Sequence, residues 1–253
     1  MTRDTEKVAG GSLLQSHEEW DARNQVLFDS MIELIERFAS FELERGLDVG
    51  CQGGRLTDDL TASTKKEWSG IDPVLSERTL SPHGGDLRPG SSDSIPFPDS
   101  HFDCLVLANV FEHIFPDRRA ASMAEMRRVL RPGGVVVGQI PNPYFPIESH
   151  SRLPFMGWLP IALQRRYWRL SPVTWEHDFY VVTMRHVAAA ASASDLQLIF
   201  KRNFNYPLSV IPEKVRPAAK VLQRPMKSFP WSWQFVLKRP DQDAGPDRAE
   251  SAE

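Results

Sequence analysis

Apolar residues at helical spacing mark the first predicted element of the chain. Between residues 13 and 38, apolar side chains recur three and four positions apart, at Leu27, Phe28, Met31, Leu34, Ile35 and Phe38. This spacing places them on one face of an amphipathic helix. We therefore predict an N-terminal helical extension over residues 1–43.

Short apolar runs alternate with helical patterns over the next hundred residues. The pattern predicts strands at 47–51, 67–72, 102–108 and 135–140, a brief strand near 83–87, and helices at 55–62 and 117–130, the last capped by Gly133 and Gly134. The run 102–108 is almost continuously apolar, which is typical of a parallel strand covered on both faces. Alternation of this kind predicts an α/β domain with a parallel sheet, and we assign it residues 44–141.

The pattern changes after Pro141. Residues 142–182 are rich in proline and aromatic side chains and lack a clear period, so we interpret them as an insertion. A helix at 184–194 and strands at 196–200 and 233–237 are predicted next, so residues 183–240 should complete the sheet. The polar residues 241–253 are predicted to form a disordered tail.

Composition excludes several classes of protein. Of the 253 residues, 41% are hydrophobic and 25% are charged, with a formal net charge of −3. The longest apolar run, residues 153–163, is shorter than the ~20 residues of a spanning helix. Residues 1–11 lack the apolar segment of a signal peptide. We therefore expect a cytoplasmic protein, and the low net charge argues against a nucleic-acid partner.

Two features of the strand ends predict a cofactor site. The first strand runs into the glycine-rich turn Gly50–Gly54, which lets a ligand approach the backbone beside a helix N-terminus. The second strand ends in Asp72, and a carboxylate in that place suits the two hydroxyls of a ribose. No Lys-Ser/Thr pair follows the glycines, so a nucleoside-bearing cofactor is favoured over a phosphate.

These residues and several further motifs resemble class I S-adenosylmethionine-dependent methyltransferases. The motifs are Leu47–Gly54, Gly70–Asp72, Gly85–Leu87, Ile95–Phe97, Phe102–Val106, Val110–His113 and Val129–Gly134, in the order of the family. The resemblance covers about residues 44–141. It implies a Rossmann-like, seven-stranded, mostly parallel sheet with helices on both faces, and the strand at 233–237 would be its antiparallel member. The Pro/aromatic-rich lid insertion would be added to this fold.

The resemblance also implies the cofactor, S-adenosylmethionine, and the residues that bind it. Asp48, Gly50 and Gly54 belong to the turn that passes under the methionine part, and Asp72 would hold the ribose hydroxyls. Asp86 would meet the adenine amine beside Leu87, and Asn109 would lie close to the cofactor at the end of its strand. Gln52 stands where the family usually has glycine, and a positive φ there would cost ~1 kcal/mol.

The insertion carries the candidate catalytic residues. It follows directly on the strand at 135–140, and ligands of open α/β sheets bind outside the carboxyl ends of the strands. We predict His150 as the general base, with His113 as a second catalytic candidate and Glu148, Glu176 and His177 as further acid–base groups. A purely structural role for these histidines stays open. No metal is expected, because Asn109 stands where metal-associated relatives carry an acid.

The insertion resembles a bacterial subgroup of methyltransferases associated with glycan and glycolipid biosynthesis. This resemblance implies a hydroxyl of a sugar or glycolipid-type acceptor as the target. Methylation of a natural-product or quinone hydroxyl, and a non-catalytic cofactor-binding module, stay open as alternatives, as does the oligomeric state. Aromatic residues beside Arg165, Arg166 and Arg169 favour weak peripheral contact with an anionic membrane.

Overall fold

The computed structural model describes residues 17–39, 43–173, 179–211, 213, 216–217, 220 and 229–241. Its strands form one sheet in the order β3-β4-β2-β1-β5-β6-β8-β7. They span Arg45–Val49 (β1), Glu67–Asp72 (β2), Thr79–Leu80 (β3), Asp86–Pro89 (β4), Phe102–Ala108 (β5), Leu130–Pro141 (β6), Gln197–Phe204 (β7) and Ser232–Lys238 (β8). The expected Rossmann-like α/β fold is thereby confirmed.

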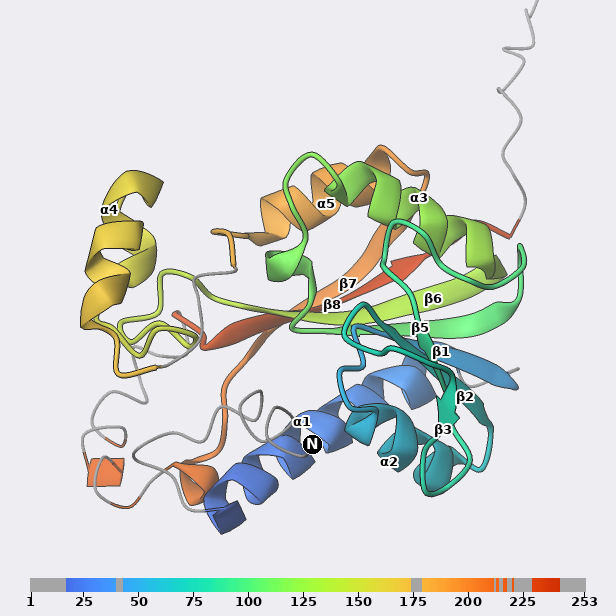
Figure 1. Cartoon of the computed structure of the whole chain (residues 1–253), viewed down its shortest axis with the longest axis horizontal. Helices are drawn as coiled ribbons and strands as arrows, with labels where there is room; N and C mark the ends of the chain where they lie inside the picture. The colour runs from blue at the N-terminus through green and yellow to red at the C-terminus, as the bar shows by residue number, and fades with distance from the viewer. Residues whose placement is uncertain are drawn as a thin grey trace, which may run out of the picture.

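Helices cover both faces of the sheet (Figure 1). On one face lie α1 (His17–Ala39) and α2 (Arg55–Thr64), and on the other lie α3 (Arg119–Val129) and α5 (Met184–Ser192). Helix α4 (Ile161–Tyr167) stands apart from the sheet, within the predicted insertion. Single 3-10 turns occupy Phe111–His113 (η1), Met156–Trp158 (η2), Trp168–Leu170 (η3) and Leu208–Val210 (η4). None of the described helices is both long and apolar enough to cross a membrane.

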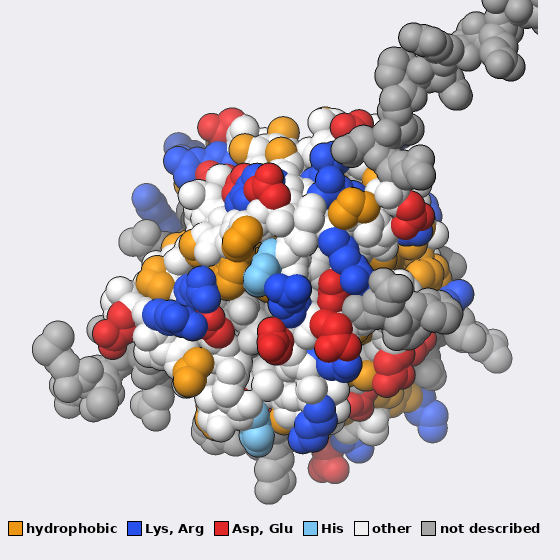
Figure 2. All heavy atoms as spheres, turned by 90° about the vertical axis from the view of Figure 1, so that its right-hand side faces the viewer, with side chains coloured by type: hydrophobic (Ala, Val, Ile, Leu, Met, Phe, Trp, Pro, Cys, Tyr) orange, Lys and Arg blue, Asp and Glu red, His pale blue; other side chains and the backbone are white. Residues whose placement is uncertain are grey.

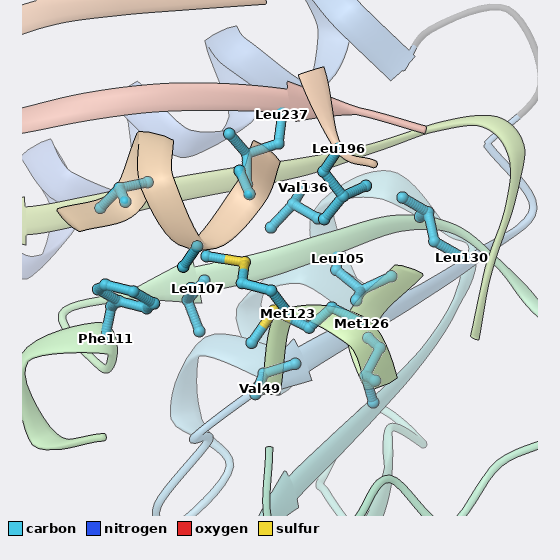
Figure 3. Packing of buried hydrophobic residues seen from close by; sticks show 14 of the residues in the cluster. Val49, Leu105, Leu107, Phe111, Met123, Met126, Leu130, Val136, Leu196 and Leu237 are labelled. Atoms are coloured by element: carbon cyan, nitrogen blue, oxygen red, sulfur yellow. The ribbon is translucent and has the colours of Figure 1, made fainter. Parts of the chain in front are cut away.

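A core of aliphatic and methionine side chains joins α3 and α5 to the sheet. Figure 3 shows Met123 and Met126 of α3 packed over Leu105, Val136 and Leu237 of the central strands. All five side chains are buried. The apolar residues that mark the helix and the strands in the sequence therefore do pack against one another in the structure.

Strand direction brings one set of strand ends to a common edge. Strands β4, β2, β1, β5 and β6 run parallel. Strand β8 lies between β6 and β7 and is antiparallel to both, which confirms the antiparallel strand expected at 233–237. The carboxyl ends of the parallel strands, where α/β proteins bind ligands, thus share the edge from which residues 142–173 emerge.

Three details of the fold differ from the expectation. The sheet has eight strands rather than seven, because the two-residue β3 pairs with β4 and is too short to show a period. Strand β4 begins at Asp86, later than the strand predicted near 83–87. Gly133 does not cap α3: the backbone is extended from Leu130, and Gly133, with φ 77°, lies inside β6. The predicted tail lies outside the described residues beyond Asp241.

Candidate active site

The glycine-rich turn after β1 requires glycine at two positions. Gly50 has φ 79° and Gly54, the N-cap of α2, has φ 81°. A Cβ atom on Gly50 would collide with the side chain of Val110, and one on Gly54 would collide with Leu87. A Cβ atom on Gly53 would meet nothing within 4 Å. The turn is therefore tightly packed on the protein side and open on the other, as a cofactor cradle must be.

Gln52 adopts the left-handed conformation inside this turn. Its φ is 50°, a region that costs ~1–2 kcal/mol for a residue with a Cβ atom. Gly53 does not have a positive φ, so it does not absorb the strain. The departure from the family pattern at Gln52 thus places a side chain at a left-handed position of the turn.

Asp72 ends β2 beside the turn. Its Oδ2 accepts a hydrogen bond of 2.8 Å from the amide of Gln52, and its Oδ1 accepts one of 2.9 Å from the amide of Val74. Each carboxylate oxygen has a second lone pair, and the side chain is half-buried. The carboxylate is therefore fixed in place with capacity left for two hydroxyl donors.

Asp48 lies beneath the turn and does not face its open side. It is 2% exposed, and its Oδ2 accepts a hydrogen bond of 2.9 Å from the hydroxyl of Thr57 in α2. Burial raises the pKa of Asp48 to about 7, although the Thr57 hydrogen bond opposes the shift. Contrary to the expectation of cofactor contact, Asp48 holds the start of α2 to β1 and so supports the turn.

The structure does not bring Asp86 to the carboxyl edge. Asp86 pairs in register with Ser69, three residues before Asp72, and its carboxylate is occupied by Arg78 and Arg88 at 2.6–3.0 Å. This contradicts the prediction that it meets adenine. Figure 2 views the opposite edge of the sheet, where acidic and basic side chains are mixed. The polar residues that follow the carboxyl end of β4 are instead Ser91, Ser92 and Asp93.

Asn109 lies at the carboxyl end of β5, as predicted. It has φ 56°, its amide donates to the carbonyl of Gln139, and its Oδ1 accepts 3.2 Å from Nε2 of Gln139. Gln139 in turn accepts from Gln234 of β8 at 2.9 Å. A row of hydrogen-bonded side-chain amides therefore fixes the start of the β5–α3 loop, next to Val110, which packs against Gly50.

The same loop carries Glu112 and His113, and the insertion brings His150 against them. Nε2 of His150 lies 3.8 Å from Oε1 of Glu112, and the rings of His113 and His150 are 5.2 Å apart. One side-chain ligand atom from each of the three residues lies within 4.8 Å of the others, so together they could hold a metal ion. The sequence motif Val110–His113 already contains Glu112 and His113, but nothing in the sequence indicated that His150 lies against them.

Glu148 orients His150. Its Oε1 lies 2.7 Å from Nδ1 of His150, and its carboxylate also accepts from the amides of His150 and Ser151. Burial alone would raise the pKa of Glu148, but His150 and these amides lower it to about 2. By contrast, burial raises the pKa of Glu112, against the opposing charges of His113 and His150. Two further candidates, Glu176 and His177, lie outside the described residues.

Comparison with known proteins assigns the family. Residues 47–138, which include the turn, Asp72 and Asn109, match the model of a methyltransferase domain. The chain carries a class I S-adenosylmethionine-dependent methyltransferase domain. The family and the cofactor expected from the sequence motifs are thereby confirmed.

Two curated relatives are similar to part of the chain. A probable S-adenosylmethionine-dependent methyltransferase of Mycolicibacterium smegmatis is 32% identical over 127 residues, 49% of this chain and 46% of the relative. The ubiquinone/menaquinone biosynthesis C-methyltransferase UbiE of Cupriavidus necator is 37% identical over 73 residues, 26% of this chain and 29% of the relative. The chain thus aligns with less than half the length of either.

Solved structures share the fold over most of the chain. The PH0226 protein from Pyrococcus horikoshii OT3 has a TM-score of 0.58 at 14% identity, covering 90% of this chain and 93% of that one. The cyclase SpnF has a TM-score of 0.53 at 14% identity, covering 85% and 81%. Because SpnF is a cyclase, this similarity supports a shared fold but not a shared reaction.

Proposed function

We propose that the chain transfers the methyl group of S-adenosylmethionine to a hydroxyl of a sugar or glycolipid-type acceptor. The observation that carries the proposal is the pair Glu148–His150, which the insertion sets against Glu112 and His113. This cluster begins two residues after Val110, the residue packed on Gly50 of the turn. The cluster of histidines and glutamates, which we place on the acceptor side, is thus next to the turn that would hold the cofactor.

The residues of the turn fit S-adenosylmethionine. The open side of the turn at Gly53 would receive the methionine part, while Gly50 and Gly54 let the turn pack closely on Val110 and Leu87. Asp72 would accept the two ribose hydroxyls with the lone pairs its amide donors leave free. Leu87, buried against Gly54, and Asn109 would border the cofactor on either side. When bound, the cofactor supplies an electrophilic methyl group on a positively charged sulfur.

A hydroxyl acceptor needs help from the protein, because it is a poor nucleophile near neutral pH. Its oxygen must lose a proton as the new carbon–oxygen bond forms and the carbon–sulfur bond breaks. We assign the activation of the acceptor oxygen to His150 and His113, while Glu148 is a positioning residue that fixes the ring of His150. The ring of Phe179, stacked on His150 at 4.5 Å, restricts it further.

A cavity near the start of the insertion supports a charged acceptor. It has a volume of about 790 Å³ and lies at the carboxyl ends of β6 and β7, between Tyr144 and Trp233. Its basic lining residues are Arg185, His186, Lys201 and Arg202, and no carboxylate is among its described lining residues. Arg202 is paired with Glu33 of α1, and burial lowers the pKa of His186, so the charges that face a ligand are those of Arg185 and Lys201. The volume suits a small-molecule acceptor, and the cations suit a phosphate such as a glycolipid carries.

Exposed apolar residues of the insertion support a lipid-borne acceptor. Phe155, Trp158 and Leu170 are largely exposed, and Arg165, Arg166 and Arg169 are exposed around them. The sequence contains no acidic residue from Ser149 to Trp175. Rings and cations in this combination suit the headgroup level of an anionic membrane, so we propose weak, reversible membrane contact by the insertion.

The experiment is a two-step assay on the full chain. Tritiated S-adenosylmethionine first tests cofactor binding, and soluble sugars, lipid-linked sugars and phenols are then screened as acceptors. We expect label to appear on a sugar hydroxyl, and His150→Ala and His113→Ala to lower its rate ~10²-fold or more at unchanged cofactor affinity. Cofactor binding without label on any sugar would contradict the proposal.

A second candidate function follows from the UbiE relatives, which are named C-methyltransferases. Here the acceptor would be a quinol-like ring, and the insertion's aromatic side chains would stack on it. The same screen separates the two, because a methyl group on a ring carbon and one on oxygen differ in the NMR spectrum of the product. Label on carbon alone would favour this second function. Cofactor binding without any transfer would favour a non-catalytic module.

A further inference from the structure

Glu112 is a buried carboxylate that has no hydrogen-bond partner among the described residues. Its side chain is 1% exposed, and within the described residues neither carboxylate oxygen has a hydrogen-bond partner. Burying such a group without a partner is strongly unfavourable. An unsatisfied buried group in a folded protein therefore points to something bound, either a water or an ion.

Two imidazoles stand around this carboxylate. The ligand atoms of Glu112, His113 and His150 all lie within 4.8 Å of one another, and Oε1 of Glu112 lies 3.8 Å from Nε2 of His150. Three atoms bound tetrahedrally to one zinc ion at ~2.1 Å lie about 3.4 Å apart. Side-chain movements of about 1 Å would therefore bring all three ligand atoms to binding distance of one ion.

Glu148 prepares His150 for this task. With a proton on Nδ1 shared with Glu148 at 2.7 Å, the lone pair of His150 is on Nε2, which faces Glu112. Glu148 is itself held by the backbone amides of His150 and Ser151. A carboxylate that fixes the second nitrogen of a histidine is the usual support of a metal-binding histidine.

We propose that Glu112, His113 and His150 bind a divalent first-row transition-metal ion such as Zn²⁺ on the acceptor side of the active site. One carboxylate oxygen and two imidazole nitrogens favour such an ion over Mg²⁺, which prefers oxygen ligands. Three protein ligands leave a coordination position open. The expectation of no metal rested on Asn109 alone and did not include His150, which is 41 residues further along the chain.

The role of the ion rests on the proposed function. The acceptor hydroxyl would take the open position, where the ion lowers its pKa and its proton passes to water. His150 and His113 then act on the acceptor oxygen as ligands of the ion and do not take the proton themselves. Metal binding itself needs no acceptor and can be measured alone.

The test begins with the full chain stripped of metal by a chelator and then dialysed. Calorimetric titration with ZnCl₂ should show one ion per chain with a micromolar or tighter Kd, and MgCl₂ should bind at least ~100-fold more weakly. Co²⁺ should give visible absorption bands from a site with nitrogen ligands. Failure of Zn²⁺ to bind would overturn the inference.

Variants locate the ion. Glu112→Gln and His150→Ala should each weaken Zn²⁺ binding at least ~100-fold, and Glu148→Gln, which keeps all three ligands, should weaken it ~10–100-fold. His83→Ala removes a histidine outside the cluster and should leave the affinity unchanged. Circular dichroism and cofactor affinity report whether each variant folds. Equal Zn²⁺ affinity in folded Glu148→Gln, Glu112→Gln and the natural chain would overturn the assignment.

The failure of this inference is distinguishable from failure of the proposed function. If the stripped chain methylates a sugar hydroxyl at the full rate in excess chelator, the function stands and the metal site is wrong. If Zn²⁺ binds through Glu112 and His150 but no sugar hydroxyl is methylated, the metal site stands and the function is wrong.

Discussion

Oδ2 of Asp72 lies 2.8 Å from the backbone amide of Gln52, so the end of β2 is tied directly to the turn that follows β1. This hydrogen bond crosses between two neighbouring parallel strands at their carboxyl ends. It fixes a carboxylate at that edge whose position suits a ribose, and it fixes the turn that would lie under the remainder of the cofactor.

Asp72→Ala should weaken S-adenosylmethionine binding by ~1.5–3 kcal/mol, a factor of about 10 to 150, because it removes a charged acceptor of two hydroxyl donors. Calorimetry with the cofactor measures the change. Asp86→Ala is the matched control, since Asp86 is engaged by Arg78 and Arg88 away from this edge. If Asp72→Ala kept the natural affinity, or Asp86→Ala lost as much, the ribose assignment would be wrong.

Gln52→Gly should raise the free energy of unfolding by up to about 1.5 kcal/mol. Removing the Cβ atom relieves ~1–2 kcal/mol of strain from the left-handed conformation. The greater conformational freedom of glycine in the unfolded chain reduces this gain by ~0.4–1 kcal/mol. Gln52→Ala keeps the Cβ atom and should stay within ~0.5 kcal/mol of the natural chain. Urea unfolding measures all three proteins, and a glycine variant less stable than the alanine variant would count against strain at Gln52.

The stability of the chain should depend on pH through Asp48. Burial raises its pKa to about 7 in the folded chain, against ~3.9 when unfolded. Between these values the folded chain holds a proton that the unfolded chain has released, so the free energy of unfolding falls as pH rises and levels off above pH 7. Asp48→Asn removes this dependence.

Urea unfolding at pH 5.5 and pH 8 tests the Asp48 prediction. Between pH 5.5 and pH 8, the free energy of unfolding of the natural chain should fall by about 2 kcal/mol more than that of Asp48→Asn. Effects of the other titrating groups cancel in this difference. A difference that stays constant with pH would mean that Asp48 is ionised in the folded chain throughout.

The sequence predicted the turn and Asp72 because both features are local. A glycine run after one apolar strand and an acid after the next identify strand ends without knowledge of packing. Asp86 was misplaced because its position depends on the register between β2 and β4, which residue types do not reveal. The cluster of Glu112 with His150 depends on the path of residues 142–150, whose lack of a period gave no signal.

Trp158→Ala and Leu170→Ala should both release the chain from anionic membranes. Trp158 is 60% exposed and Leu170 is 72% exposed, beside the arginines of α4 and η3. Trp158 also donates a hydrogen bond to the carbonyl of Tyr144, so Leu170→Ala tests the surface with less effect on the insertion itself. Leu80→Ala is the matched control, because Leu80 is equally exposed but lies in β3.

Vesicle sedimentation measures this contact. At low salt the natural chain and Leu80→Ala should sediment with phosphatidylglycerol vesicles and not with phosphatidylcholine vesicles, since both rings and cations contribute. Salt at 1 M should abolish the binding, because the Debye length falls to ~3 Å. If the natural chain stays in solution at low salt and still methylates a water-soluble sugar at the full rate, the insertion serves the acceptor and not a membrane.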